Sequence, residues 1–216
     1  MSHRTALVVM ARYPAVGEVK TRLARAIGAE RAAALYHAFL RDLDARFAGQ
    51  RRVLVWAFHP ADSDFAALVS AGARCVAQEG ADLSARMYNC FRRLCADGFA
   101  RVLMIGSDVP HVRDEWLDEA EARLEHADVV LGPTEDGGYY LIAMRAPHDV
   151  FTGIETGTAH VLADTCRKAE AAGLRVHRLP ASFDIDEHDD LLRLRALIAD
   201  AGTASRIPAT AALLRE

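Results

Sequence analysis

The run from Val102 to Pro110, Val-Leu-Met-Ile-Gly-Ser-Asp-Val-Pro, constrains the fold more than any other stretch of this chain. A continuous apolar segment that stops at Gly106 and Pro110 is typical of a strand buried on both faces, at the middle of a parallel sheet. Asp108 then lies at the carboxyl end of that strand. Open α/β sheets bind ligands at this edge, so Asp108 is a candidate functional residue.

Asp108 has a second interpretation, because aspartate also initiates turns and caps helices. A helix is predicted over Asp114 to Leu124, and it needs a cap at its amino end. Asp114 can supply that cap itself. We therefore favour a functional role for Asp108.

Strand and helix patterns alternate along the chain, and no internal repeat or linker interrupts them. This order predicts an α/β fold, a three-layer α/β/α sandwich with a Rossmann-like, mainly parallel sheet, in one domain of 216 residues. The strand at 139–144 is expected to return antiparallel to its neighbour. Strands are predicted at 5–11, 52–58, 73–77, 102–106, 128–132, 139–144 and 174–179, and helices at 29–48, 62–71, 82–96, 114–124, 159–172 and after 201.

Composition excludes several classes of protein. There are 26 Lys and Arg against 30 Asp and Glu, a formal charge of -4 with no basic cluster, so nucleic acid is not an expected partner. The four cysteines lack the spacing of a metal site and are expected to be small buried hydrophobes. The apolar stretch at 6–11 is too short for a signal peptide core, and no segment reaches the length of a membrane span. A cytoplasmic location is the expectation.

The loop after the first strand, Arg12 to Leu23, contains Gly17 and ends in the cations Lys20 and Arg22. A strand that leads into a basic, glycine-containing loop and then a helix commonly binds phosphate through backbone N–H groups and cations. The loop does not match a Walker A motif, because Val19 stands where that motif has glycine. The alternative is a solvated loop whose cations have no special role.

Two later segments concentrate acidic residues. In the first, Asp136-Gly137-Gly138-Tyr139, adjacent glycines let a ligand or another chain segment approach closely. This segment is a plausible substrate wall, and it also fits a plain Asp-Gly hairpin turn. In the second, Asp184 and Asp186 alternate along an extended segment, so both are expected to point to one side.

Asp189 and Asp190 follow in the first turn of the next helix, where the helix dipole favours negative charge. We assign these two residues a structural role. Arg86 follows the predicted cap residue Asp82, and the residues alone favour a solvent-facing position for its side chain.

Aspartates at two distant strand ends, together with the cations of the first loop, suggest a divalent metal that bridges nucleotide phosphates. Mg²⁺ or Mn²⁺ needs few carboxylates, since phosphate oxygens and water complete its shell. One aspartate from each place would be enough, so the predicted ligands are Asp108 together with Asp186 or Asp184. The metal and Lys20 would neutralise charge on a diphosphate or phosphoryl group.

The order of motifs resembles the bacterial family called radical-SAM/selenodomain-associated transferase 1, whose fold is that of the glycosyltransferase-A-like, nucleotide-diphospho-sugar transferase superfamily. The resemblance covers nearly the whole chain. It rests on Ala11-Arg12-Tyr13-Pro14 with Gly17 and Val19-Lys20-Thr21-Arg22-Leu23, Asp82-Leu83 with Arg86-Met87, Gly106-Ser107-Asp108-Val109-Pro110, Gly132-Pro133 with Asp136-Gly137-Gly138-Tyr139-Tyr140-Leu141-Ile142, and Asp184-Ile185-Asp186. The chain departs from it after Ile154, where Glu155-Thr156-Gly157-Thr158 replaces an expected Trp-Ser-Thr stretch.

The resemblance implies a nucleotide-binding half, about residues 1–110, and a more variable acceptor half, about 111–216. It implies that Asp108 holds the metal, that Lys20 holds the phosphates and that Asp186 completes the metal site. Lys20 is also expected to be a catalytic residue. The expected substrate-binding residues are Arg12, Lys20, Arg22, Arg86, Gly137, Gly138 and Tyr139.

Three functional hypotheses follow. The first is a metal-dependent transferase that uses a nucleotide-activated sugar and glycosylates a small acceptor, with Asp136 as the residue that orients the acceptor or acts as general base. The second is a nucleotidyltransferase that joins a nucleoside triphosphate to a small phosphorylated compound and releases pyrophosphate. The single aspartate in Ser107-Asp108-Val109 favours it, since many glycosyltransferases of this fold carry Asp-x-Asp. The third is a nucleotide-binding module without activity.

Overall fold

A seven-stranded sheet forms the middle layer of the protein in the computed structural model, which describes residues 4–215. The strand order is β3-β2-β1-β4-β6-β5-β7, and β6 alone runs antiparallel to its neighbours. This confirms the predicted fold class. The elements are β1 (Thr5–Arg12), α1 (Thr21–Ile27), α2 (Ala29–Phe47), β2 (Val53–His59), the 3₁₀ turn η1 (Phe65–Leu68), β3 (Arg74–Ala77), α3 (Leu83–Ala96), β4 (Arg101–Gly106), α4 (Asp114–Arg123), β5 (Val129–Pro133), β6 (Tyr139–Met144), α5 (Val161–Ala171), β7 (Val176–Arg178), α6 (His188–Leu197), α7 (Ala201–Arg206) and α8 (Pro208–Arg215).

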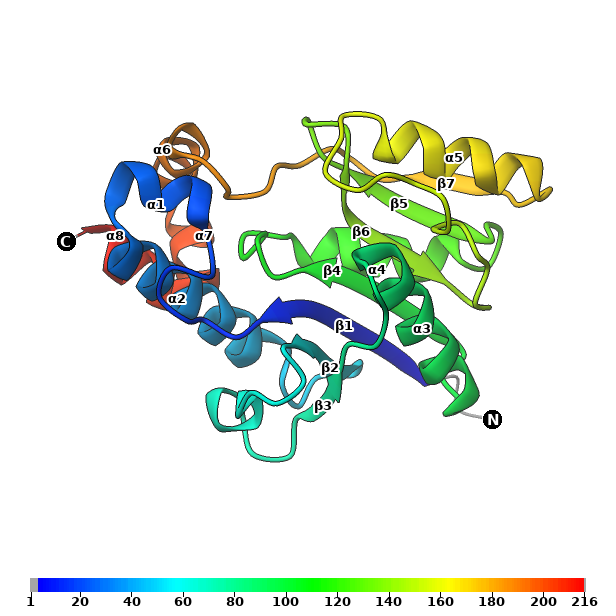
Figure 1. Cartoon of the computed structure of the whole chain (residues 1–216), viewed down its shortest axis with the longest axis horizontal. Coiled ribbons are helices and arrows are strands. Elements are labelled where there is room, and N and C mark those ends of the chain that lie inside the picture. The colour runs from blue at the N-terminus through cyan, green and yellow to red at the C-terminus, as the bar shows by residue number, and fades with distance from the viewer. Residues whose placement is uncertain (1–3, 216) are drawn as a thin grey trace.

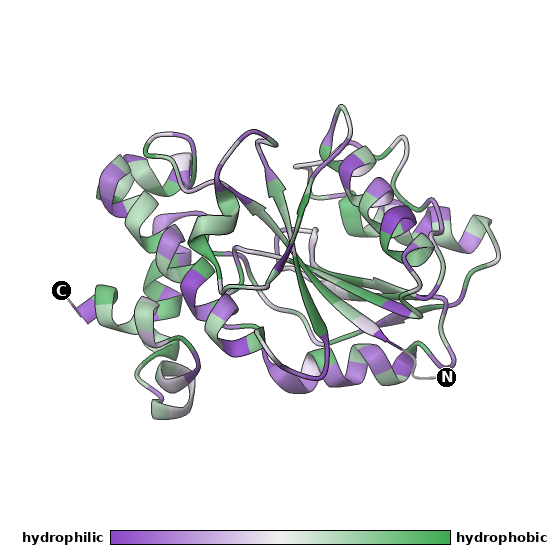
Figure 2. Cartoon of the chain, turned by 90° about the horizontal axis from the view of Figure 1, so that it is seen from below, coloured by the Kyte–Doolittle hydropathy of each residue, from purple (hydrophilic) through white to green (hydrophobic). Residues whose placement is uncertain are grey.

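Successive side chains of a strand point to opposite faces of the sheet, and in these strands both sets are apolar. Helices therefore cover both faces. In β1, Leu7 and Val9 belong to a core shared with α1, α2, α4 and α6, whereas Ala6 and Val8 belong to a core shared with α3 and α5. Figure 1 shows α1, α2, α6, α7 and α8 gathered at one end of the molecule, opposite α5. Figure 2 shows apolar strands inside and polar residues on the outer helical surfaces. No helix within residues 4–215 combines the length and apolarity that crossing a membrane requires.

Three local predictions were wrong. Residues 62–71 form only the four-residue turn η1, and α1 begins at Thr21, inside the stretch that was expected to be a loop. Asp114 does not cap α4, because Arg113 occupies the cap position and Asp114 is already helical, where it accepts a hydrogen bond from Arg46 (2.8 Å). Asp82 does cap α3, through a bond from the Ala85 backbone N–H.

The sheet order creates a reversal point beside β1. The chain adds β2 and β3 on one side of β1 and then returns to place β4 on the other side. Because β1 and β4 are neighbouring parallel strands, the loops that follow them leave the sheet at the same edge. A crevice opens between them, which is where open α/β sheets bind ligands.

The chain after Ala201 forms two short helices, because Pro208 cannot continue the hydrogen-bonding pattern of α7. Asp42, a buried residue of α2, accepts bonds from the backbone N–H groups of Ala209 and Thr210, both at 2.8 Å. A buried carboxylate thus caps the amino end of α8 and fixes this helix against α2.

We predict that Asp42→Ala lowers the free energy of unfolding by about 2 kcal/mol, because it removes a cap and leaves buried N–H groups without a partner. Urea denaturation measures the change, and Asp62→Ala, at an exposed position, is the control. An Asp42→Ala protein as stable as the control would contradict this role for the cap.

Candidate active site

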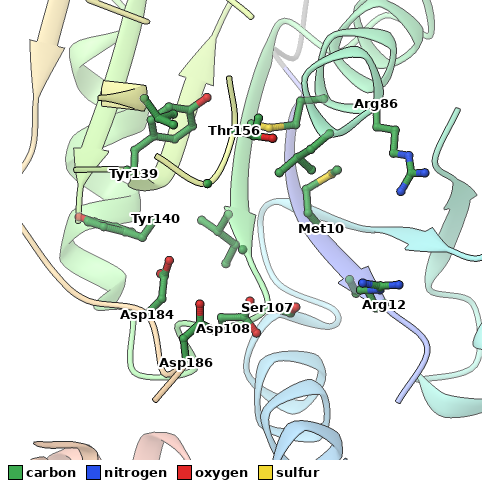
Figure 3. Close-up of a pocket in the computed structure, with 18 of the residues that line it drawn as sticks. Met10, Arg12, Arg86, Ser107, Asp108, Tyr139, Tyr140, Thr156, Asp184 and Asp186 are labelled. Carbon is green, nitrogen blue, oxygen red and sulfur yellow. The ribbon is translucent and has the colours of Figure 1, made fainter. Parts of the chain in front are cut away.

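The crevice at the carboxyl ends of β1 and β4 is a cavity of about 880 Å³, within the usual range for small-molecule sites. Its walls come from both halves of the chain. Figure 3 shows Arg12 and Arg86 on one side, Tyr139 and Tyr140 on the other, and the carboxylates of Asp108, Asp184 and Asp186 near one another.

The Lys20 ammonium forms ion pairs with two of these carboxylates. It contacts Asp108 Oδ1 and lies 2.9 Å from Asp186 Oδ1. Only 3% of the Lys20 side chain is exposed, against 38% for Asp108 and 28% for Asp186, so the carboxylates rather than the ammonium face solvent. Burial alone would lower the pKa of Lys20, but the charges of Asp108 and Asp186 raise it above the ordinary value and keep the group cationic.

The backbone at Lys20 adopts a conformation that few residues other than glycine adopt. With a φ of 50°, it is the one non-glycine residue in the left-handed region among residues 4–215. The left-handed conformation costs a lysine on the order of 1 kcal/mol, and such costs concentrate at functional sites. It turns the chain from the first loop into α1 and buries the side chain between Asp108 and Asp186.

The segments that carry Asp108 and Asp186 are joined by a backbone hydrogen bond. The Ile185 N–H donates to the Asp108 carbonyl (3.0 Å), which sets the register between the end of β4 and the segment after β7. Arg46 of α2 secures the loop that follows Asp108, donating to the carbonyls of Pro110 (2.8 Å) and Val112 (2.7 Å). The carboxylates therefore stand on fixed backbone.

Asp184 is the carboxylate in this group with no cationic hydrogen-bond partner among residues 4–215. Burial, together with the charges of Asp108 and Asp186, raises its pKa to about 7. Asp184 and Asp186 both line the cavity while Ile185 between them is buried, so the two aspartates do point to one side as the alternation predicted.

These carboxylates offer oxygen donors, the ligands that Mg²⁺ and Mn²⁺ prefer. They do not form a complete cage, since no group of three or more His, Cys, Asp or Glu within the described range 4–215 is arranged to hold a metal ion. After burial, the charges of Asp108 and Asp186 contribute to the raised pKa of Asp184, and a bound cation would relieve that repulsion. The site thus fits a metal that takes part of its coordination from a bound phosphate.

The other predicted cations lie in the part of the cavity wall that the first 110 residues form. Arg22 is half exposed and pairs with Asp186 and, at 3.4 Å, with Glu187. Arg12 is exposed at the end of β1. Arg86 lines the cavity and donates from Nε to the Gly80 carbonyl (3.2 Å), so its side chain is turned toward the site rather than only toward bulk solvent.

The Asp136 segment forms the hairpin turn between β5 and β6. One oxygen of Asp136 accepts bonds from the Thr134 hydroxyl (2.5 Å) and the Gly138 N–H (3.1 Å), which stabilises the turn. The hairpin turn is confirmed, and since Asp136, Gly138 and Tyr139 line the cavity, the substrate wall stays a prediction.

Gly137 is an exception among the predicted substrate-binding residues, because it does not line the cavity. Its φ is +88°, and a Cβ there would lie 2.1 Å from the Ala159 carbonyl oxygen. The Gly137 carbonyl also accepts a bond from the Leu162 N–H (2.8 Å). Because Gly137 has no side chain, the chain before α5 can approach it closely. This contact holds the loop 155–159 against the turn.

Several cavity residues escaped prediction, and Tyr36 and Gln78 are the two whose hydrogen bonds join neighbouring strands. Tyr36 of α2 accepts a bond from the Arg12 N–H (2.9 Å), and its hydroxyl lies 2.8 Å from Ser107 Oγ, so it joins the ends of β1 and β4. Gln78 donates to the carbonyls of Ala11 (3.1 Å) and Ala57 (2.7 Å). The sequence gives one sign of the role of Tyr36, a hydroxyl within the apolar face of a helix. A tyrosine that only packs in the core shows the same pattern.

We predict that Gly137→Ala lowers the free energy of unfolding by at least about 2 kcal/mol, because backbone strain and the clash with Ala159 add together. Gly153→Ala is a matched control: its φ is +82° with nothing within 4 Å of the added Cβ, so it should cost only about 1 kcal/mol. Chemical denaturation of both variants measures the difference, and equal losses would mean that the contact with Ala159 contributes nothing.

Comparisons with known proteins agree with this fold. Residues 40–158 match the model of a family described as "Uncharacterized protein conserved in bacteria (DUF2064)". A solved structure from Desulfovibrio desulfuricans G20, assigned as a nucleotide-diphospho-sugar transferase, is 35% identical and covers 100% of this chain and 98% of its own, with a TM-score of 0.88. Among curated proteins there is no match.

More distant structures share the fold alone. A CMP:2-keto-3-deoxy-manno-octonic acid synthetase complexed with CTP is 13% identical over 91% of this chain and 98% of its own, with a TM-score of 0.57. A cytidylyltransferase from Leptospira borgpetersenii serovar Hardjo-bovis is 10% identical over 99% and 97%, with a TM-score of 0.58. The family match spans more than half of the chain, and the chain belongs to the DUF2064 family, with the fold of the nucleotide-diphospho-sugar transferases.

Proposed function

We propose that this protein is a metal-dependent transferase that takes a glycosyl group from a nucleotide-activated sugar and passes it to a small acceptor. One observation carries the proposal: a buried ammonium from the first loop and carboxylates from two distant segments meet at the carboxyl edge of β1 and β4. The fold shared with the Desulfovibrio protein supports a nucleotide as the substrate. The narrower resemblance to the radical-SAM-associated transferases stays a prediction, as does a cytoplasmic location.

The cations that the first 110 residues contribute to the cavity, which form its donor side, have separate roles in this proposal. Lys20 and Arg22 bind the diphosphate, and Arg12 and Arg86 extend the cationic surface along the same wall. In the structure Lys20 and Arg22 are paired with carboxylates, so phosphate must compete for cations that are already neutralised. That competition favours a ligand that brings its own divalent cation.

Asp108 and either Asp186 or Asp184 would hold Mg²⁺ or Mn²⁺, and phosphate oxygens of the substrate and water would supply its other ligands. When bound, the metal supplies charge stabilisation to the departing diphosphate. The protein's own contribution is to hold the carboxylates on fixed backbone and to keep Lys20 protonated between them, where its positive charge adds to the potential at the phosphates.

Asp136 is the proposed residue for orienting the acceptor or for removing its proton. One of its oxygens holds the turn, and the side chain lines the cavity beside Gly138 and Tyr139. A fixed carboxylate at the wall opposite the cations suits a general base, because it can accept a proton without competing for the phosphates.

Nucleotidyl transfer is the second candidate. The lone Asp108 at the end of β4 and the fold shared with cytidylyltransferases favour it. Pyrophosphate release from a nucleoside triphosphate would identify this reaction, whereas release of a nucleoside diphosphate from a nucleotide sugar would identify glycosyl transfer.

We predict that a nucleoside diphosphate, triphosphate or nucleotide sugar stabilises the protein, by about 2.7 kcal/mol at a hundred times its dissociation constant. Lys20→Met should weaken binding of every phosphate ligand by roughly tenfold or more, because it removes the buried charge. Arg25→Met, which removes an exposed cation outside the cavity, is the matched control. Thermal shift with and without Mn²⁺ measures both, and the absence of stabilisation by any nucleotide would refute the proposal.

We also predict that Mn²⁺ binds weakly to the free protein and at least tenfold more tightly when a nucleotide is present, since phosphate oxygens complete its shell. The loss of the free Mn²⁺ electron paramagnetic resonance signal measures binding without reference to activity. Asp108→Asn should remove the enhancement, and Asp114→Asn, outside the cavity, should keep it. Unchanged Mn²⁺ binding in Asp108→Asn would exclude this residue as a ligand.

A further inference from the structure

Charge is divided unevenly between the two sides of the cavity. The cations in its lining, Arg12, Lys20, Arg22 and Arg86, together with His59, all come from the first 110 residues. The lining contributed by residues 111–215 contains three carboxylates, Asp136, Asp184 and Asp186, and no Lys, Arg or His. Asp184 and Asp186 belong to the proposed metal site, which leaves Asp136 as the acceptor-side carboxylate and no positive charge on that side among the described residues.

Cations of the acceptor half are held away from the cavity. Arg193 forms a double hydrogen bond with Glu135 (3.0 and 2.7 Å), and Lys168 contacts the Thr152 carbonyl and lies 3.4 Å from Asp149. Neither cation lines the cavity. A phosphate or carboxylate on the acceptor would have no charged partner on this side.

The remainder of the acceptor wall is apolar or weakly polar. Ile142, Phe151, Ile154 and Val161 form an aliphatic and aromatic surface, and the loop at 156–159 adds threonine hydroxyls at the rim. Burying an anion against such a surface without a partner is costly, whereas a hydroxyl or amine can bond to the aspartates and threonines.

Divalent metal does not reverse this argument. In the proposed function the diphosphate of the nucleotide sugar neutralises the charge of the metal and of Lys20. These cations therefore leave no net positive charge for an anionic acceptor. Asp136 is the lining carboxylate that the proposed metal site does not use, and it would repel a second anion placed beside the aliphatic residues.

We infer that the acceptor is a non-anionic compound, a neutral alcohol or an amine, that carries no phosphate or carboxylate. This inference rests on the proposed function. In the transfer, the acceptor oxygen or nitrogen forms a bond to the anomeric carbon, and the bond from that carbon to the diphosphate oxygen breaks. The bonding electron pair leaves with the nucleoside diphosphate, and the acceptor proton passes to Asp136 and then to water.

Matched pairs of compounds test the inference. Glycerol and glycerol 3-phosphate, glucose and glucose 6-phosphate, and ethanolamine and phosphoethanolamine differ within each pair by one phosphate. Calorimetry on protein saturated with UDP or CDP and Mn²⁺ gives the dissociation constant of each. We expect the unphosphorylated member to bind at least tenfold more tightly. Tighter or equal binding by the phosphorylated members, or binding by no unphosphorylated compound, would overturn the inference.

A charge introduced on the acceptor wall provides the second test. Thr156 is an exposed residue at the rim of the cavity, and Ala163 is an exposed residue of α5 outside it. Thr156→Arg should improve binding of the phosphorylated members by roughly tenfold, because it supplies the missing partner, and Ala163→Arg should not. Equal effects in the two variants would count against the assigned wall.

The two proposals can fail separately. Stabilisation by a nucleotide alone is measured first, and its absence removes the proposed function. If the nucleotide binds while the phosphorylated member of each pair is preferred, only the acceptor class is wrong, and nucleotidyl transfer to a phosphorylated compound becomes the better interpretation.

Discussion

The ammonium of Lys20, enclosed between two carboxylates, is the interaction on which this site depends. It joins three segments that are far apart in the sequence: the first loop, the end of β4 and the chain after β7. Without that cation, Asp108 and Asp186 would repel each other within a partly buried space. The same charge lies at the edge of the sheet, beside the place where we propose that phosphate binds.

Much of this arrangement could be predicted from local patterns. The apolar run before Asp108 places that residue at a strand end, and the period of an extended chain places Asp184 and Asp186 on one side. These predictions succeeded because each depends on the residue's own strand or loop and on the general rule that parallel strands end at one edge. The fold class followed from the same alternation of elements.

Other features depend on contacts between segments that no local pattern reports. The hydroxyl of Tyr36 reaches Ser107 only because α2 crosses the ends of β1 and β4, and Gln78 bonds to two neighbouring strands. Gly137 showed that something approaches closely, but not that Ala159 does. The residues at 62–71 had helical composition, yet packing of Phe65 under β2 is satisfied by a single turn.

The antiparallel strand β6 brings a short turn to the same edge of the sheet as the end of β4. Because β6 enters the sheet between β4 and β5, its first residues lie at the same edge as the last residues of β4. A turn of five residues, 134–138, therefore reaches the reaction centre where a parallel connection would need a whole helix. One short segment thus lines the cavity through Asp136 and Gly138 and holds the chain before α5 in place through Gly137, so a change in this turn would alter two parts of the cavity wall at once.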